Sequence, residues 1–152
     1  MSELITKLNQ AHATFVDFYF QYKHFHWHYR GPDFYQFHKL FDKHASMIFP
    51  VIDLNAERIR QLDGHVITDL QNLGSASILT QVNNSKDFDS QTYILPHLHN
   101  NHLIVIKDLK EIIVMADEQN DPSTSDMVIK FLQDHELMNW FIKSYMLPDN
   151  KA

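Results

Sequence analysis

Apolar residues recur at intervals of three and four along most of the chain, which is the spacing of amphipathic helices. The first such pattern runs from about Ser2 to Tyr29, with its apolar side formed by Leu4, Leu8, Ala11, Phe15, Phe18, Tyr22, Phe25 and Tyr29. Gly31-Pro32 ends this helix, and Asp33 is a candidate N-cap for a second helix that continues to Asp63-Gly64. Pro50 lies inside the second pattern, where we expect a kink or a loosened turn in a helix that survives, because the periodicity resumes in phase.

The periodicity fades between His65 and Asp89, where only the segment TDLQNLGSASI is compatible with a short helix. Two further helices are predicted, from about Ser90 to Glu118 and from about Pro122 to Met146. Short loops on either side of one long crossover are typical of a four-helix bundle with ferritin-like connectivity. We therefore predict an all-α fold, with a short extra helix in the crossover between the second and third long helices. We expect residues 1–152 to form one domain.

The amino-acid composition excludes several kinds of functional site and disfavours some partners. With no cysteine among 152 residues, disulfides, thiolate metal sites and cysteine nucleophiles are excluded. We find neither a signal-like N-terminal segment nor an apolar run of the roughly 20 residues that a membrane span needs, so we expect a soluble, cytoplasmic protein. The net charge of −6 and the lack of a basic run disfavour nucleic acid as a partner. Eleven histidines are the unusual feature.

Four potential metal ligands share one strip of the second predicted helix. Taking His38 as zero, a turn of about 100° per residue places Asp42 near 40°, Asp53 near 60° and Glu57 near 100°. Either pair alone is more simply interpreted as a solvated face. All four in one strip favour metal binding.

These ligands are too far apart to bind one metal within one chain. His38 and Glu57 are separated by roughly 28 Å of helix, and Asp42 and Asp53 by roughly 16 Å. The pairs are symmetric about a midpoint near residues 47 and 48. A second copy of the helix, packed antiparallel across a two-fold axis, brings each pair opposite the other and forms two identical sites.

His26 is the third part of the predicted site. It lies about one turn before the end of the first helix, at the height of His38 in an antiparallel hairpin. Two imidazoles and three carboxylates suit Fe(II), while Zn(II), Mn(II) or Co(II) can compete. Because the chain contains no Glu-x-x-His, the di-iron motif of ordinary ferritins within one subunit is absent.

The segments FHWHYRGPDFYQFHKLFDK and DLNAERIRQLDG resemble the Dps-type mini-ferritins, the DNA-binding proteins from starved cells, and DPSTSDMVIKFLQDHELMNWFIKSYM is similar more weakly. The resemblance implies a hollow dodecamer that oxidises Fe(II), preferentially with hydrogen peroxide, stores ferric mineral and protects against oxidative stress. The family's ferroxidase ligands fall on His26, His38 and Asp42 of one subunit and on Asp53 and Glu57 of its two-fold mate.

The resemblance also suggests roles for three further residues. Trp27 matches a tryptophan that quenches radicals beside the site in many relatives, and its alternative interpretation is a core aromatic. Asp121 and Asp126 match acidic residues that line the family's iron pores, but helix capping and N-terminal charge explain them equally simply. Lys130 replaces an acid that some relatives carry one turn further on.

DNA binding is where we expect this chain to depart from the family. Relatives that bind DNA usually carry a lysine-rich terminus, whereas the ends of this chain hold only Lys7 and Lys151. The competing hypotheses are an architectural DNA-compacting protein and a structural cage clamped by zinc without iron turnover. Among the remaining histidines, we expect His97, His99 and His102 to be polar surface residues rather than an auxiliary metal site.

Overall fold

The computed structural model describes residues 2–148, Ser2 by its backbone alone, and this part of the chain is helical without strands. The α-helices are α1 (Ser2–His28), α2 (Phe34–Gln61), α3 (Leu70–Ala76), α4 (Leu95–Glu118) and α5 (Pro122–Tyr145). A short π-helical segment, η1 (Ser90–Ile94), leads into α4. No helix within the described range is long and apolar enough to cross a membrane.

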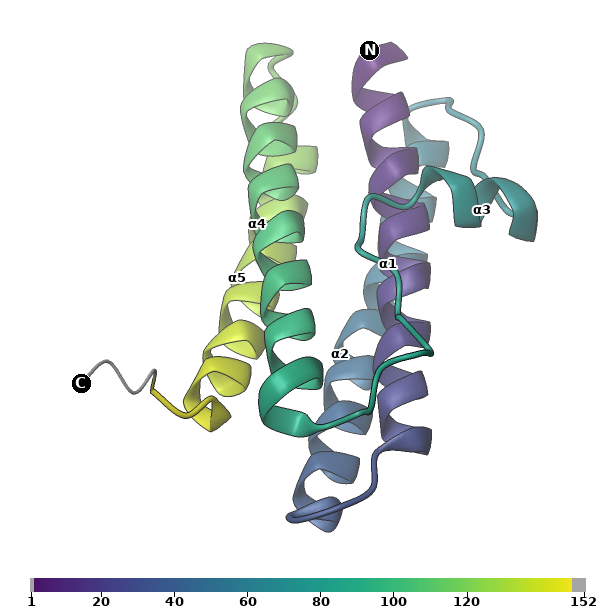
Figure 1. The fold of residues 1–152 in the computed structure, drawn as a ribbon. Helices are drawn as coiled ribbons and strands as arrows, with labels where there is room; N and C mark the ends of the chain where they lie inside the picture. Colours follow the sequence, from purple (N-terminus) through teal and green to yellow (C-terminus); the bar gives the residue numbers. More distant parts are fainter. Residues whose placement is uncertain (1, 149–152) are drawn as a thin grey trace.

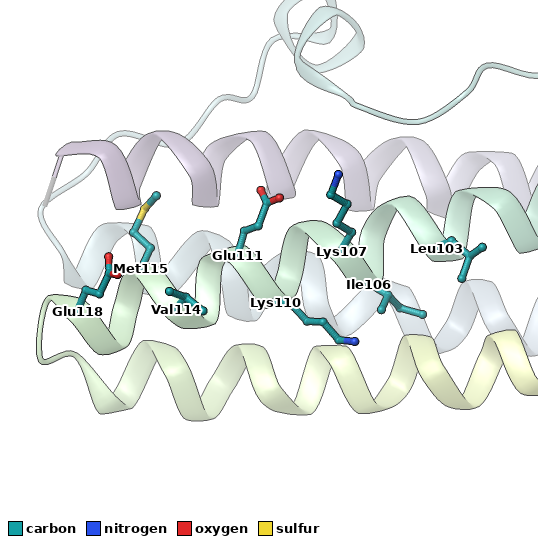
Figure 2. A pocket seen from close by; sticks show the side chains of 8 residues that line it. All are labelled: Leu103, Ile106, Lys107, Lys110, Glu111, Val114, Met115 and Glu118. Carbon is teal, nitrogen blue, oxygen red and sulfur yellow. The ribbon is translucent and has the colours of Figure 1, made fainter.

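The four long helices form two antiparallel pairs, α1 with α2 and α4 with α5, packed into one bundle (Figure 1). The crossover returns along the whole length of the bundle, so that α2 and α4 run in the same direction, and α3 lies beside α1 (Figure 1). The predicted ferritin-like connectivity and the extra helix in the crossover are therefore confirmed.

The apolar stripe predicted for the first helix is confirmed in full, because each of its eight residues is buried. The stripe of α2 is buried at Phe37, Phe41, Ile48 and Ile59 as well. Burial of such stripes is the main force that holds amphipathic helices together. The core runs along the axis of the bundle and is unusually rich in aromatic rings.

Local details differ from the prediction at two points. Asp33 does not cap α2 through its side chain, since it takes up a left-handed backbone conformation with φ 61° and closes the turn instead. The third predicted helix begins as the wider η1 turn, capped by Asp89. As predicted, helix α2 survives through Pro50, which is exposed. Lys151 lies outside the described residues.

Side-chain amides fasten the crossover to the bundle. Asn101 of α4 donates to the carbonyl of Thr80 and accepts from its backbone N–H. Gln21 of α1 donates to the same carbonyl. At the other end of the crossover, Asn9 donates to the carbonyl of His65. Because buried backbone groups need partners, these contacts allow an irregular segment to lie against the helices.

Candidate metal centre

Two histidines face each other across the hairpin between α1 and α2. The Nδ1 of His26 donates to the backbone carbonyl of His38 at 2.6 Å, and the Nδ1 of His38 donates to the carbonyl of His26 at 2.8 Å. Their rings stack with centroids 3.8 Å apart. A carbonyl oxygen only accepts, so the proton of each neutral ring is held on Nδ1. Both Nε2 lone pairs are therefore available to a metal, and hydrogen bonds fix both rings.

Asp42 brings a carboxylate to the same place. Its Oδ1 lies 4.0 Å from Nε2 of His26 and 2.6 Å from Nζ of Lys23. The hydrogen bond and the charge of Lys23 lower the pKa of Asp42 below its ordinary value, so the carboxylate is ionised at neutral pH. The Asp42 carboxylate therefore lies near His26, but His26, His38 and Asp42 are not placed to hold a metal ion by themselves.

Asp53 and Glu57 do not join this group within one subunit. Both lie exposed on α2, and Asp53 is about 16 Å along the helix from Asp42. Among residues 2–148 there is no set of three or more histidine, aspartate or glutamate side chains placed to hold a metal ion within one chain. A site made from all five predicted ligands would require a second subunit.

An exposed aromatic patch lies on the helix pair that carries the candidate ligands. Phe20 of α1 and Phe49 of α2 are both more than half exposed, and Tyr19 contacts the two rings at centroid distances of 5.3 and 5.5 Å. We call Tyr19, Phe20 and Phe49 the aromatic patch. Phe49 stands next to residues 47 and 48, the midpoint between the two ligand pairs. Exposed apolar clusters of this kind mark interaction surfaces.

Residues 5–147 match the family model of the ferritin-like domain. General stress protein 20U of Bacillus subtilis is 28% identical over 148 residues, covering 96% of this chain and 99% of the relative. The DNA protection during starvation protein of Agrobacterium fabrum is 29% identical over 150 residues, covering 95% and 88%. The X-ray structure of Dps from Thermosynechococcus elongatus superposes with a TM-score of 0.91 and 28% identity, covering 98% and 93%.

The chain belongs to the ferritin-like family as a Dps-type mini-ferritin. The Dps-type bundle accounts for the short helix in the crossover.

The two acidic residues matched to the pores of Dps-type proteins differ in environment. Asp121 caps α5, accepting from the backbone N–H of Thr124 at 3.0 Å, and pairs with Nη2 of Arg58 at 2.8 Å. Burial raises the pKa of Asp121, but the hydrogen bonds with Thr124 and Arg58 outweigh it and bring the pKa below its ordinary value. Asp126 is exposed and makes a 3.4 Å ion pair with Lys130. The capping interpretation therefore describes Asp121 well, while the side chain of Asp126 stays accessible.

Trp27 and two of the remaining histidines require corrections. The interpretation of Trp27 as a core aromatic is wrong, because 63% of the residue is exposed. The expected surface position is wrong for His97 and His102, which are both buried in the bundle. His99 is half-buried and bonds to Asn139. The role of Trp27 as a radical quencher stays a prediction.

A cluster of buried polar rings was not anticipated from the sequence. We call it the core histidine cluster, and it consists of Tyr22, His44, His102 and His135. His44 contacts the Tyr22 hydroxyl at 3.0 Å, Tyr22 contacts Nε2 of His102 at 2.5 Å, and Nδ1 of His102 lies 3.1 Å from Nδ1 of His135. A signal was present in the sequence, because His102 stands in phase with Leu98, Val105 and Leu109.

Proposed function

We propose that this Dps-type chain oxidises Fe(II), preferentially with hydrogen peroxide, at sites shared between two subunits. The ferric product is stored inside a cytoplasmic dodecameric cage, which removes both reagents that generate hydroxyl radicals and so limits oxidative stress. The ligands are His26, His38 and Asp42 of one subunit with Asp53 and Glu57 of its two-fold mate. Iron is the substrate, and zinc is the expected competitor for the same donors.

The observation that carries this proposal is the paired imidazoles. Reciprocal hydrogen bonds from Nδ1 to backbone carbonyls fix the rings of His26 and His38, so that Nε2 is the nitrogen that each ring can offer to a metal. The carboxylate of Asp42 stands beside them, partnered by Lys23. We infer that Asp53 and Glu57 of a second subunit complete this donor set with the further oxygen ligands that an iron site prefers.

The surface of α2 supports a two-fold partner. Asp53 and Glu57 are exposed, and Phe49 of the aromatic patch lies between them and His38 along the sequence of α2. Packing the patches of two antiparallel subunits against each other would bury these rings and bring Asp53 and Glu57 opposite His38 and Asp42. Such an isologous contact forms the site twice.

The chemistry follows from the donor types. Two Fe(II) ions supply the two electrons that break the O–O bond of one hydrogen peroxide, and with two protons the products are two water molecules and two ferric ions. The imidazoles orient the iron through fixed rings. The carboxylates balance the increased charge of the ferric ions because they are anionic. They can also bind through one or both oxygens as the iron changes oxidation state. Because both electrons are available at one place, no hydroxyl radical needs to be released.

The proposal places protection in iron chemistry rather than in DNA compaction. A chain with a net charge of −6 repels phosphate backbones, and a cage multiplies that charge by its number of subunits. We therefore expect no direct binding of DNA near neutral pH.

The test is the addition of Fe(II) without oxygen to the metal-free protein, followed by stoichiometric hydrogen peroxide. Ferric absorbance and a hydroxyl-radical trap are followed together. The variants are His38→Ala and Asp53→Ala, each alone and re-assembled as a mixture. Matched controls are His65→Ala and Asp117→Ala, which alter exposed residues away from the candidate ligands.

We expect fast oxidation without trapped radicals in the wild type and in both controls, and a loss of at least tenfold in each ligand variant. In the mixture, a dimer of one His38→Ala and one Asp53→Ala subunit keeps one intact site, so roughly a quarter of the sites should recover. Oxidation no faster than in buffer, together with tight zinc binding, would instead favour the zinc-clamped cage.

A further inference from the structure

The core histidine cluster connects all four long helices at the centre of the bundle. Tyr22 comes from α1, His44 from α2, His102 from α4 and His135 from α5, and each is no more than 1% exposed. Buried polar groups are costly unless they bond to one another. Apolar residues would fill this space without that cost, so the cluster calls for an explanation other than packing.

The Tyr22 hydroxyl has an imidazole nitrogen on each side. The shorter contact is 2.5 Å to Nε2 of His102, and the longer is 3.0 Å to Nδ1 of His44. Burial raises the pKa of Tyr22 well above its ordinary value, so the phenol keeps its proton at any physiological pH. Burial, assisted by the neighbouring histidines, lowers the pKa of His102 well below its ordinary value. A neutral His102 has one bare ring nitrogen.

The contacts around His102 allow two proton arrangements, and the one in which the Tyr22 hydroxyl donates gives the phenol a base. When the Tyr22 hydroxyl donates to Nε2 of His102, the imidazole proton lies on Nδ1 and is donated to Nδ1 of His135 at 3.1 Å. The Nε2 of His135 is then protonated, and it is buried without a partner. The phenol therefore faces a base at hydrogen-bond distance in a site closed to water.

Aromatic rings surround this pair and extend toward the candidate metal centre. Phe18 lies 5.1 Å from the ring of Tyr22 and 4.6 Å from that of His102. Phe41, the residue before Asp42, lies 6.2 Å from Tyr22. Tyr22 also precedes His26 by four residues, a rise of about 6 Å along α1. Tyr22 therefore lies about one helical turn from a candidate ligand on α1 and contacts the ring that precedes Asp42 on α2.

We propose that Tyr22 is a redox-active residue that gives one electron to oxidants formed at the metal centre, while its phenolic proton moves to Nε2 of His102. The inference rests on the proposed ferroxidation for the source of its oxidant. A site that holds a single Fe(II) reduces peroxide by one electron and yields a ferric ion, hydroxide and a hydroxyl radical. Tyr22 then reduces that radical to a second hydroxide, leaving a neutral tyrosyl radical beside a protonated His102.

The next Fe(II) ion to bind reduces the tyrosyl radical of Tyr22 back to the phenol. It gives one electron to the tyrosyl radical, His102 returns the proton, and the products are Fe(III), the phenol and a neutral imidazole. Two Fe(II) ions and one peroxide are consumed in total, as at a fully loaded site. Tyr22 thus allows a half-filled site to complete the reaction without releasing a radical.

The first experiment uses the assembled protein with one Fe(II) per candidate site, mixed with peroxide and frozen for electron paramagnetic resonance. We compare the wild type with Tyr22→Phe and with Tyr35→Phe, which alters an exposed tyrosine of α2. Ring-deuterated tyrosine identifies the signal as tyrosyl. Circular dichroism and particle size confirm that Tyr22→Phe, which conserves the ring volume, still folds and assembles.

We expect a tyrosyl signal in the wild type and in Tyr35→Phe that falls at least fivefold in Tyr22→Phe, with several-fold more hydroxyl radical trapped. The rate of iron oxidation at full loading should stay within about twofold of wild type, since Tyr22 is not a ligand. An equal signal in Tyr22→Phe, or iron oxidation at half loading with no tyrosyl signal, overturns the proposal.

A second experiment separates this inference from the proposed ferroxidation. Azide radicals generated by pulse radiolysis oxidise the metal-free protein without iron, and fluorotyrosine at position 22 keeps both hydrogen bonds while it alters the radical spectrum. A long-lived tyrosyl radical that changes with this substitution supports the assignment, even if the protein proves not to oxidise iron. A radical that is unaffected by fluorotyrosine at position 22 refutes it, whatever the iron assay shows.

Discussion

At the scale of single residues, the buried imidazoles determine how the fold responds to acid. Burial, with a smaller contribution from His44, lowers the pKa of His135 from 6.5 to about 3. The folded pKa is depressed, so below pH 6.5 the unfolded chain binds a proton that the folded chain does not. The stability present above this pH is therefore lost as the pH falls toward the folded pKa, by about 1.4 kcal/mol per pH unit for each such histidine.

Replacing His135 tests this dependence directly. We expect the free energy of unfolding of metal-free His135→Phe to fall less steeply than that of the wild type between about pH 6 and pH 4. The difference in slope should be about 1.4 kcal/mol per pH unit, the contribution of one proton. Urea unfolding at fixed protein concentration measures it, with His65→Ala, at an exposed position, as the control. Identical slopes in wild type and His135→Phe would mean that His135 is already protonated in the folded protein.

At the scale of helices, the end of α2 depends on one glycine. A Cβ added to Gly64 would lie 2.7 Å from Cγ2 of Ile5 and 2.8 Å from Cγ2 of Ile59, both closer than real contacts allow. We expect Gly64→Ala to lower the free energy of unfolding by about 1–3 kcal/mol, because the tight packing of α1 against this turn must open. Gly74 on α3 has open space around it, so Gly74→Ala should be neutral or slightly stabilising by less than about 1 kcal/mol. Equal effects of the two changes in thermal unfolding would contradict this reasoning.

The start of α5 allows the capping and pore interpretations to be separated. Asp121→Ala removes the cap on Thr124 and leaves Arg58 without its carboxylate, so we expect a loss of about 2 kcal/mol. Asp121→Asn keeps an accepting oxygen for the cap and should lose less. Asp126→Ala should stay within about 0.5 kcal/mol of wild type, because its ion pair is exposed. If Asp126→Ala nevertheless slows iron uptake, measured as ferric absorbance, the pore interpretation applies to Asp126.

Sequence periodicity predicts best those helices that are stabilised by burying one apolar side. The stripe from Leu4 to Tyr29 was predicted residue by residue, since apolar spacing alone determines which side of a helix is buried. His102 was misplaced because its polarity was given more weight than its position in phase with Leu98 and Val105. The left-handed conformation of Asp33 depends on the geometry of the whole turn, which residue types do not specify.

At the scale of the whole molecule, the sequence predicts the two groups of candidate ligands but not how these groups come together. The strip of His38, Asp42, Asp53 and Glu57 follows from helix geometry, and the structure adds the reciprocal bonds that orient His26 and His38. In the proposed site, the contact between the two groups of ligands depends on a second subunit, and the local pattern of one chain carries only indirect information about that contact. The exposed aromatic patch is the part of that information that can be tested by mutation.

The proposed two-fold contact can be tested at Phe49, which is 62% exposed beside the midpoint of the ligand pairs. Two Phe49→Glu subunits would bring like charges together across the axis in a poorly solvated contact, which disfavours association. We expect smaller particles by sedimentation, helix content unchanged by circular dichroism, and ferroxidation lost although every ligand is present. Val114→Glu on α4, at a similarly exposed residue outside the patch, is the matched control and should keep its iron activity. A Phe49→Glu protein that is monomeric yet oxidises iron at the wild-type rate would show that one subunit suffices, and the assignment of Asp53 and Glu57 to a partner would have to be abandoned.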